Sequence, residues 1–596
     1  MTLKQKTRDE IPEQYKWVLS DIFANDDLWK AAYDFVLARS SELASFQGKL
    51  TSAAAISDCF TLYYELDRRM SLVMAYAHMK HHEDMSLPRY QTMKDQSAGC
   101  TIRLNAAAAF IEPEILGADE NVIKAFVDAN PVYEHYIENL MRSKKHVRSA
   151  EVEELLARAD EIAEAPYNIF SMLESADMKF GTLKDEKGLE VELTHGRFVS
   201  FMESEDRSVR ERAFKTFYKA FTAQKNTLAS AYYSSVKADI FFSEARNYPS
   251  ALEAALFDHN IPQDVYHCLI QEVHNHLTHL HRYIALRKKH LNIDELHMYD
   301  IYAPIVKDVN RKIEYEEAKE TVLKALTPLG EEYCGVVKRG FDSRWIDVYE
   351  NKGKHTGAYS WGITFGIHPY VLLNFDNKTD DMFTLAHEMG HALHNYYTES
   401  TQPFVYAEYS IFAAEVASTV NEALLTDYLL KTLTDPNQRA YVINHYLEQF
   451  RTTLFRQTMF AEFEMTTHKM AEQDEPLTVE NLCRVYRELN ERYYGKNMVI
   501  DNEIEFEWAR IPHFYNAFYV YQYATGMSAA QALSQKILKE GPAAVDAYID
   551  FLKSGSSEYP IDALKKAGVD MTTAAPIQSA MELFAKLVSE LEEGLA

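Results

Sequence analysis

The segment His387-Glu388-Met389-Gly390-His391 is the strongest chemical signal in this sequence. Residues four apart lie on one face of an α-helix, so the imidazoles of His387 and His391 can point at a single metal ion. Neutral imidazole nitrogen suits zinc, and a catalytic zinc site keeps one position open for water. Glu388 is rotated about 100° from His387, which places it beside the ion rather than on it. There it can accept a proton from a water whose pKa the metal lowers toward ~7.

Glu415 is the acidic residue that we expect to complete the metal site. It stands in the run Phe412 to Thr419, whose other members are small or apolar. An unpaired carboxylate on such a helix face is costly to bury, and metal ligation would offset that cost. An ion pair with a lysine or arginine is the alternative. Glu422, two turns further along the same face, is expected to accept an N–H from a ligand histidine.

The other histidines are expected to lie outside the metal site. His394 shares the face of His387 but lies seven residues on, about 10 Å along the helix axis, which is too far for one ion. For two further clusters we favour structural or solvated histidines, because neither has a correctly placed base together with a distant carboxylate. These clusters are His78, His81 and His82, and His274, His276, His279 and His281. For the motif itself, the alternative is a polar helix with two incidental histidines.

The segment from Arg510 to Tyr523 combines His513 with four tyrosines. Most of this aromatic run is expected to be core, but a buried hydroxyl needs a partner. Peptide hydrolysis requires donors aimed at the oxyanion that forms on the scissile carbonyl. His513, with one or two of the tyrosines, is predicted to supply them.

The elements that must position these residues are mostly helical, as 20 Gly and 17 Pro among 596 residues indicate. Helical periodicity covers residues 24–165, 207–291 and 380 onward. A β-hairpin is predicted around the turn Lys184–Gly188. A second β patch at 345–375 precedes the motif helix, and an edge strand at Gly357, Ala358 and Tyr359 is expected to hold the substrate backbone. Pattern changes predict an N-terminal helical region (1–115), a helical lobe with the β-hairpin (116–200) and a catalytic domain (201–596).

Charge and cysteine content exclude several classes of protein. The net charge of -27 opposes binding along a nucleic acid. The five cysteines are odd in number and widely spread, which favours free thiols in a reducing compartment. The N-terminus has no apolar run, and no stretch approaches the ~20 apolar residues of a membrane span. We therefore expect a cytoplasmic protein with neither a signal peptide nor a membrane partner.

Seven motifs, in this order, resemble the M3 family of metallopeptidases, and specifically its oligoendopeptidase F branch. The resemblance covers nearly the whole chain, with no departure at the expected metal ligands. The motifs are Trp17–Phe23, Asp206–Arg210, Gly357–Ser360, Leu372–Phe375, His387–His394, Ala414–Thr419 and Ile511–Tyr515.

The resemblance implies a mainly α fold in which two helical lobes enclose a deep substrate channel, with a small β-sheet next to the zinc-binding helix. It implies one Zn²⁺ per chain, bound by His387, His391 and Glu415. Among the tyrosines near His513 we select Tyr519 and Tyr515. Because the spacings in other family members do not map cleanly onto this chain, Tyr521 and Tyr523 remain open.

These observations together predict a zinc endopeptidase that hydrolyses internal bonds of short peptides, with Glu388 as general base. The first alternative is a dipeptidyl carboxypeptidase on the same scaffold, which would need a cationic or amide group to anchor the C-terminal carboxylate of its substrate. The second is an inactive helical peptide-binding protein, which the intact Glu388 disfavours. Short peptides are the expected partners, and the oligomeric state is left open.

Overall fold

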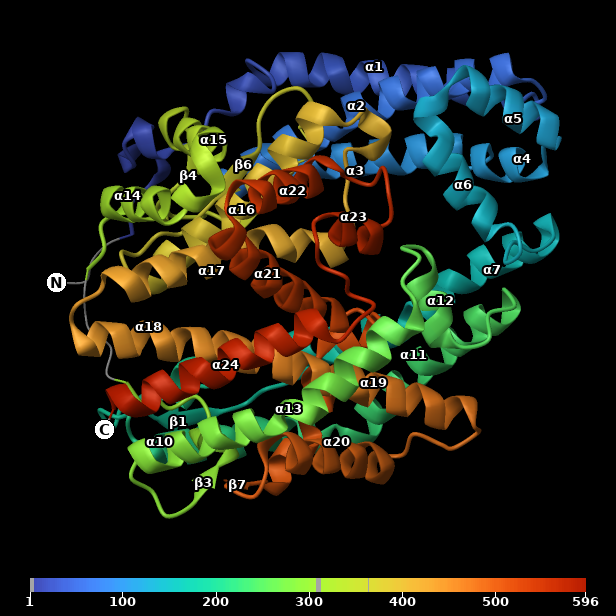
Figure 1. Cartoon of the computed structure of the whole chain (residues 1–596). Helices are drawn as coiled ribbons and strands as arrows, with labels where there is room; N and C mark the ends of the chain where they lie inside the picture. The colour runs from blue at the N-terminus through green and yellow to red at the C-terminus, as the bar shows by residue number, and fades with distance from the viewer. Residues whose placement is uncertain (1–4, 307–311, 363, 596) are drawn as a thin grey trace. The chain divides into compact units, whose positions relative to one another are not determined.

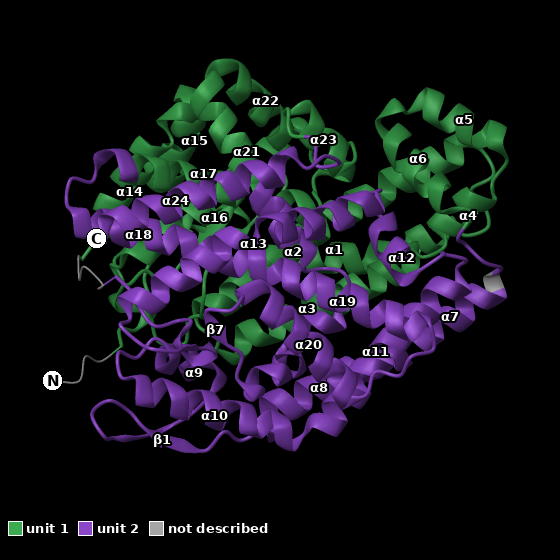
Figure 2. Ribbon diagram, turned by 60° about the horizontal axis from the view of Figure 1, so that its bottom comes forward, with its two compact units in different colours: residues 1–145, 310–429, 530–569 green, residues 146–309, 430–529, 570–596 purple. Residues whose placement is uncertain are grey.

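Helices form almost all of the regular structure, as predicted from the composition (Figure 1). The computed structural model describes residues 5–306, 312–362 and 364–595. The chain divides into two compact units, each built from three separate stretches of sequence (Figure 2). Unit 1 comprises residues 1–145, 310–429 and 530–569, and unit 2 comprises residues 146–309, 430–529 and 570–596. The three consecutive regions expected from the sequence remain a prediction.

Unit 1 contains the motif helix and a core built on its N-terminal helices. α2 is capped by the Ser52 side chain, which accepts a hydrogen bond from the Ala55 N–H. Apolar residues of α2 at helical spacing, such as Ile56, Phe60 and Val73, are buried, and α2 packs on α1, α3 and α5. The unit 1 helices are α1 (Asp26–Ala44), α2 (Ala53–Glu83), α3 (Pro88–Ala108), α4 (Ile111–Gly117), α5 (Glu120–Ala129), α6 (Glu134–Ser143), α14 (Tyr315–Ala325), α15 (Gly330–Asp342), α16 (Thr379–Thr401), α17 (Ile411–Thr432), α22 (Pro542–Lys553) and α23 (Pro560–Lys566).

Unit 2 is also helical and carries the aromatic segment around His513. In it a π-helical turn, Phe450–Phe455, connects α18 directly to α19. Helix α21 (Tyr521–Glu540) has residues in both units, and the last three residues of α17 also belong to unit 2. The other unit 2 helices are α7 (Ala150–Ala163), α8 (Ala165–Met172), α9 (His195–Met202), α10 (Arg207–Ala223), α11 (Lys225–Ala245), α12 (Ala251–Phe257), α13 (Gln263–His290), α18 (Pro436–Gln449), α19 (Arg456–Glu472), α20 (Val479–Tyr494) and α24 (Ala575–Gly594).

A small sheet in unit 1 lies against the motif helix, as predicted. Its order is β4 (Ile346–Asp347), β6 (Tyr370–Leu372), β5 (Tyr359–Trp361), with β4 parallel and β5 antiparallel to β6. Helix α16 packs on β5 and β6. The buried Asp347 carboxylate pairs with Arg8 and with Lys354, whose Nζ lies 2.7 Å from Asp347 Oδ1. Strand β5 is an edge strand of this sheet. The ion pairs of Asp347 stabilise the opposite edge strand, β4.

The predicted β-hairpin is present in unit 2. β1 (Thr182–Lys184) and β2 (Glu190–Glu192) are antiparallel, with Leu183 opposite Val191. Gly188 closes the turn at a φ of 75°, a conformation that favours glycine. A further pair joins β3 (Leu296–His297) to β7 (Met498–Val499) in parallel.

All five cysteines are free thiols, as predicted, and three of them are buried. Among the described residues, no helix combines the length and the apolar character that crossing a bilayer requires. The reducing compartment and the cytoplasmic location remain predictions.

Candidate metal centre

Helix α16 begins at a carboxylate that caps it. The Asp381 carboxylate accepts hydrogen bonds from the backbone N–H groups of Asp376, at 2.9 Å, and Lys378, at 2.8 Å. An acidic side chain in the first turn also interacts favourably with the helix dipole. These contacts set where the helix starts, and therefore which face carries His387 and His391.

The backbones of α16 and α17 come into contact beside the motif. Gly390 faces Ala417 and Ser418 of α17 without an intervening side chain. The Asn421 side chain donates a 3.0 Å hydrogen bond to the Ala386 carbonyl, and its own oxygen accepts one from Tyr333 at 2.9 Å. Neither Gly390, although it lies inside the motif, nor Asn421 was assigned a role from the sequence. Asn421 could have been found from the sequence, because an amide side chain within the apolar run of α17 must find hydrogen-bond partners when buried.

The structure brings together the three predicted metal ligands. His387 Nε2 lies 3.2 Å from His391 Nε2, and Glu415 Oε2 lies 3.7 and 3.8 Å from these two atoms. Four tetrahedral ligands at zinc–nitrogen and zinc–oxygen bond lengths would be about 3.3 Å apart. Among the described residues, His387, His391 and Glu415 form the one group of three or more histidine, cysteine or acidic side chains whose ligand atoms lie close enough together to hold a metal ion. The donor set therefore fits Zn²⁺.

Each proposed ligand side chain is oriented by a hydrogen bond to a neighbouring group. His387 Nδ1 donates to Glu422, as the sequence predicts, and the His391 imidazole bonds to the Ala414 carbonyl. The Ser418 hydroxyl donates to Glu415 Oε2 at 3.1 Å. With Nδ1 of His387 engaged in this way, its Nε2 is directed toward the other ligand atoms, the orientation that metal-binding histidines require.

The two imidazoles differ in their electrostatic surroundings. Burial lowers the pKa of His391 well below its ordinary value, and the neighbouring His387 lowers it further. Burial also acts to lower the pKa of His387, but Glu422 outweighs burial and raises this pKa to about 9. Because only neutral imidazole ligates a metal, ion binding must displace a proton from His387.

Glu388 lies buried beside the ligand group, at 7% exposure. Burial raises its pKa to about 7, partly offset by His387. The Ser360 N–H, in the middle of β5, donates to this carboxylate. Among the described residues its Oε2 atom has no hydrogen-bond partner. Since the Ser360 N–H points at Glu388 and not at β6, the open edge of β5 faces the motif helix.

The predicted substrate strand is anchored at both ends. Gly357 has a φ of 81°, and its carbonyl accepts a 2.7 Å hydrogen bond from Asn374. The Tyr359 hydroxyl lies 2.8 Å from His82 Nδ1. Ala358 lies between these anchors. The segment is thus held by the Gly357 carbonyl, by the Tyr359 hydroxyl and by the pairing of β5 with β6.

The histidines expected to lie elsewhere do so. The His394 ring stacks on Tyr409 with a centroid distance of 3.6 Å and lies outside the ligand group. His78 stacks on Trp361, whereas His274 bonds to Glu462 at 2.7 Å. Each of the two clusters thus has a histidine with a protein partner.

In unit 2, His513 is surrounded by two of the four candidate tyrosines. Tyr519 and Tyr523 lie 6.0 and 6.1 Å from its ring, and 5.5 Å from each other. Tyr515 instead stacks on Phe170, with the ring centroids 4.7 Å apart. Tyr521, in turn, packs on the Tyr266 ring of α13. The structure therefore groups Tyr519 and Tyr523 with His513, whereas Tyr515 stacks elsewhere.

The turn before Tyr519 is strained. Phe518 has a φ of 57°, unfavourable for a bulky side chain. Its N–H donates at 3.1 Å to the fully buried Glu464, and its ring packs on His468. These contacts hold the backbone that positions Tyr519.

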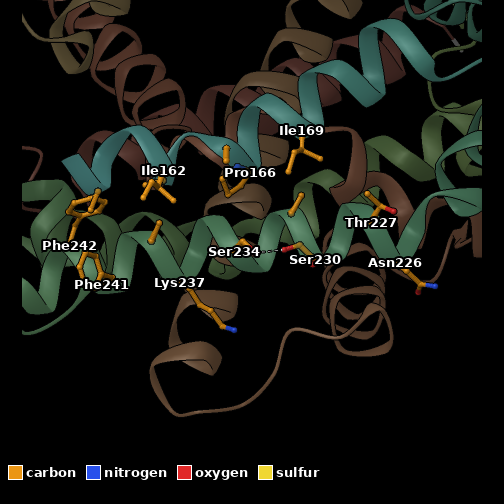
Figure 3. A pocket seen from close by; sticks show the side chains of 15 residues that line it. Ile162, Pro166, Ile169, Asn226, Thr227, Ser230, Ser234, Lys237, Phe241 and Phe242 are labelled. Carbon is orange, nitrogen blue, oxygen red and sulfur yellow. Dashed lines mark hydrogen bonds between the residues drawn. The ribbon is translucent and has the colours of Figure 1, made fainter. Parts of the chain in front are cut away.

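A separate groove of about 790 Å³ runs between α7–α8 and α11 in unit 2 (Figure 3). Ile162, Pro166 and Ile169 face α11 across it, while Lys237 extends away. Its lining is mostly apolar and holds none of the predicted site residues.

The sequence model of peptidase family M3 matches residues 200–583, and that of oligopeptidase F matches residues 114–180. The chain belongs to peptidase family M3. As a family member it is a metallopeptidase. It is 49% identical to the oligopeptidase PepF of Bacillus subtilis strain 168, with 98% of this chain and 88% of that protein covered.

Solved structures extend this family likeness to the fold. An oligoendopeptidase F structure from Enterococcus faecium is 39% identical with a TM-score of 0.75, covering 97% of this chain and 99% of that one. A structure from Chlamydophila abortus is 34% identical with a TM-score of 0.92, covering 99% and 100%. The family membership predicted from the seven motifs is confirmed.

Proposed function

We propose that this protein is a zinc-dependent endopeptidase that hydrolyses internal bonds of short peptides. The observation that carries the proposal is the convergence of His387, His391 and Glu415 with the buried Glu388 beside them. The substrate class is supported by relatives named oligopeptidase and oligoendopeptidase. One Zn²⁺ per chain would be held by the two imidazoles and the Glu415 carboxylate.

The chain's own residues divide the acid–base work. When bound, zinc lowers the pKa of a water and polarises the scissile carbonyl. Glu388 takes the proton of the attacking water and passes it to the leaving amine. Glu422 keeps His387 in the tautomer that presents Nε2. His513 and Tyr519 donate hydrogen bonds to the developing oxyanion.

Strand β5 would hold the substrate in an extended conformation. An edge strand offers unpaired backbone groups, to which a peptide adds as a further strand. The Ser360 N–H already points at Glu388, so a peptide on the outer edge at Gly357, Ala358 and Tyr359 would pass the general base. Recognition through backbone is broad in sequence and requires an extended chain, which a native protein does not offer.

A peptide blocked at both ends tests this function. We expect the zinc-loaded enzyme to cut an N-acetylated, C-amidated octapeptide at internal bonds, and to lose this activity with a chelator and regain it with zinc. A native globular protein in the same digest should stay intact. Cleavage confined to unblocked peptides, releasing dipeptides from the C-terminus, would instead indicate a dipeptidyl carboxypeptidase. Equal activity after complete removal of metal would contradict the zinc mechanism.

A further inference from the structure

Unit 2 contains two carboxylates that are each shared by two arginines: the partly exposed Glu448 and the buried Glu507. Glu448 accepts hydrogen bonds from Arg287 at 2.9 Å and from Arg451 at 2.6 Å. Arg287 and Arg451 are each 1% exposed at the side chain. The Arg451 Nη1 atom has no hydrogen-bond partner among the described residues.

The second shared carboxylate is Glu507. Its Oε1 atom accepts from Arg456 and from Arg510, both at 2.7 Å. Its Oε2 atom accepts from the Tyr486 hydroxyl at 2.6 Å. One carboxylate oxygen therefore serves two guanidinium groups.

Counting charges leaves this region with an excess of two positive charges, since four arginines face two carboxylates. Burial acts to raise the pKa of both Glu448 and Glu507, but the arginines outweigh it and lower each to about 2, so both acids already carry their full charge. Within the described part of the chain, no other carboxylate lies at ion-pair distance from these arginines. Buried charge without a counter-charge is destabilising. Such an excess is expected where an anion binds.

The excess lies beside the aromatic segment. Tyr302 interacts electrostatically with Arg451, Arg456 and Arg510, and the Arg451 guanidinium lies 5.0 Å from its ring. Burial lowers the pKa of His513, and the positive charge of Arg456 lowers it further. Arg456 and Arg510 are 15% and 21% exposed, so a ligand can reach them. Arg451 lies in the π-helical turn Phe450–Phe455, which Arg456 directly follows, and such turns are frequent at functional sites.

We propose that Arg451, Arg456 and Arg510 form a subsite for a carboxylate of the peptide substrate. This proposal rests on the peptidase function above. A short peptide supplies one such group in its C-terminal carboxylate, and a glutamate or aspartate side chain supplies the same chemistry. Guanidinium groups bind carboxylates through paired hydrogen bonds. Anchoring a chain end would favour short peptides over long ones without making the enzyme an exopeptidase.

If Arg456 carries uncompensated charge, its replacement should not destabilise the protein, whereas replacing an arginine with a purely structural role should. In Arg456→Met, Glu507 keeps its bonds to Arg510 and Tyr486, and one uncompensated positive charge is removed. We expect this variant to unfold at the same temperature as the wild type or higher, while losing carboxylate recognition. Arg456→Lys keeps the charge but not the forked geometry and should be intermediate. Arg484→Met removes a half-exposed arginine of α20 and serves as the charge control.

The experiment compares kcat/KM for four peptides with the same core. One pair ends in a free carboxylate or an amide and contains no acidic residue. The other pair is amidated and carries Glu or Gln near its end. The same peptides are titrated into the Glu388→Gln variant by calorimetry, which measures binding without turnover.

We expect the wild type to favour the carboxylate in one pair by about 10- to 100-fold, in kcat/KM and in affinity. Arg456→Met should abolish this preference, and Arg484→Met should retain it. A preference within the first pair would show that the subsite binds the C-terminal carboxylate, and a preference within the second pair would show that it binds an acidic side chain. Equal values within both pairs, a preference that survives in Arg456→Met, or marked destabilisation of that variant would overturn the subsite. If the wild type cut none of the peptides, the proposed function itself would have failed.

Discussion

A methyl group on Gly390 would lie 2.6 Å from the carbonyl oxygen of Ala417, and equally close to the Cα of Ser418. Real Cβ atoms do not approach backbone so closely, so any side chain at position 390 must push α16 and α17 apart. These two helices carry all three proposed ligands. The glycine inside the motif therefore sets the distance between the imidazoles and Glu415.

We expect Gly390→Ala to destabilise the protein by about 1–3 kcal/mol through overpacking, and to lower its zinc content. Thermal unfolding and elemental analysis of the purified protein would measure the two effects. Gly99→Ala, in α3, is the matched control because its added methyl meets nothing within 4 Å. That control should be neutral or stabilising by up to ~1 kcal/mol. Full zinc content in Gly390→Ala would show that the helix spacing does not govern the site.

Glu388→Gln should keep the metal and lose most turnover. Glutamine preserves the shape of the side chain but cannot take up the proton, and general base catalysis contributes typically ~10²- to 10⁴-fold. Metal analysis beside a peptide assay makes the distinction. Near-normal kcat in a zinc-loaded variant would exclude Glu388 as the base.

Substitutions around the ligands should separate metal binding from packing. Glu415→Ala removes a donor and should lower zinc content sharply. Glu422→Gln weakens the hydrogen bond to His387 and should reduce zinc affinity about 10- to 100-fold. His394→Ala, by contrast, should retain one zinc per chain because that ring packs on Tyr409. Competition with a chromogenic chelator would measure the affinities, and loss of zinc in His394→Ala alone would contradict this ligand set.

Tyrosine-to-phenylalanine variants should rank the aromatic donors. Tyr519→Phe is expected to lower kcat by about 10²- to 10³-fold, the usual cost of losing an oxyanion donor. Tyr515→Phe should have a smaller effect because its ring stacks on Phe170 away from His513. KM and thermal stability serve as controls for misfolding. A larger loss of kcat in Tyr515→Phe than in Tyr519→Phe would reverse the assignment.

Acid should destabilise the protein through Glu448 and Glu507. Their pKa values lie at about 2 in the folded protein, below the ordinary value of 4.5, because the contacting arginines outweigh burial. Their stabilising contribution is therefore complete above pH ~4.5 and is lost as pH falls toward ~2. Melting temperatures measured across this interval should decline more steeply for the wild type than for Glu448→Gln. The exposed Glu488→Gln should follow the wild type, and an identical decline in all three would refute the linkage.

Local sequence determined the parts of the site that depend on helix periodicity. His387 and His391 share a face because they are four residues apart. Glu415 stood out because a carboxylate on an apolar helix face needs a partner. The edge strand next to the motif helix was likewise visible as a short pattern between turn residues. These features follow from interactions within a few residues, which a single sequence encodes directly.

Tertiary structure alone decided which side chains distant in sequence lie next to one another. Ser360 bonds to Glu388, and Tyr519 but not Tyr515 lies beside His513, although all four tyrosines fit the sequence equally well. The sharing of Glu507 by Arg456 and Arg510 is also invisible in sequence, because 62 basic residues offer many equivalent pairings. Such contacts depend on how helices cross and which rotamers the packed interior allows, and these are properties of the folded chain as a whole.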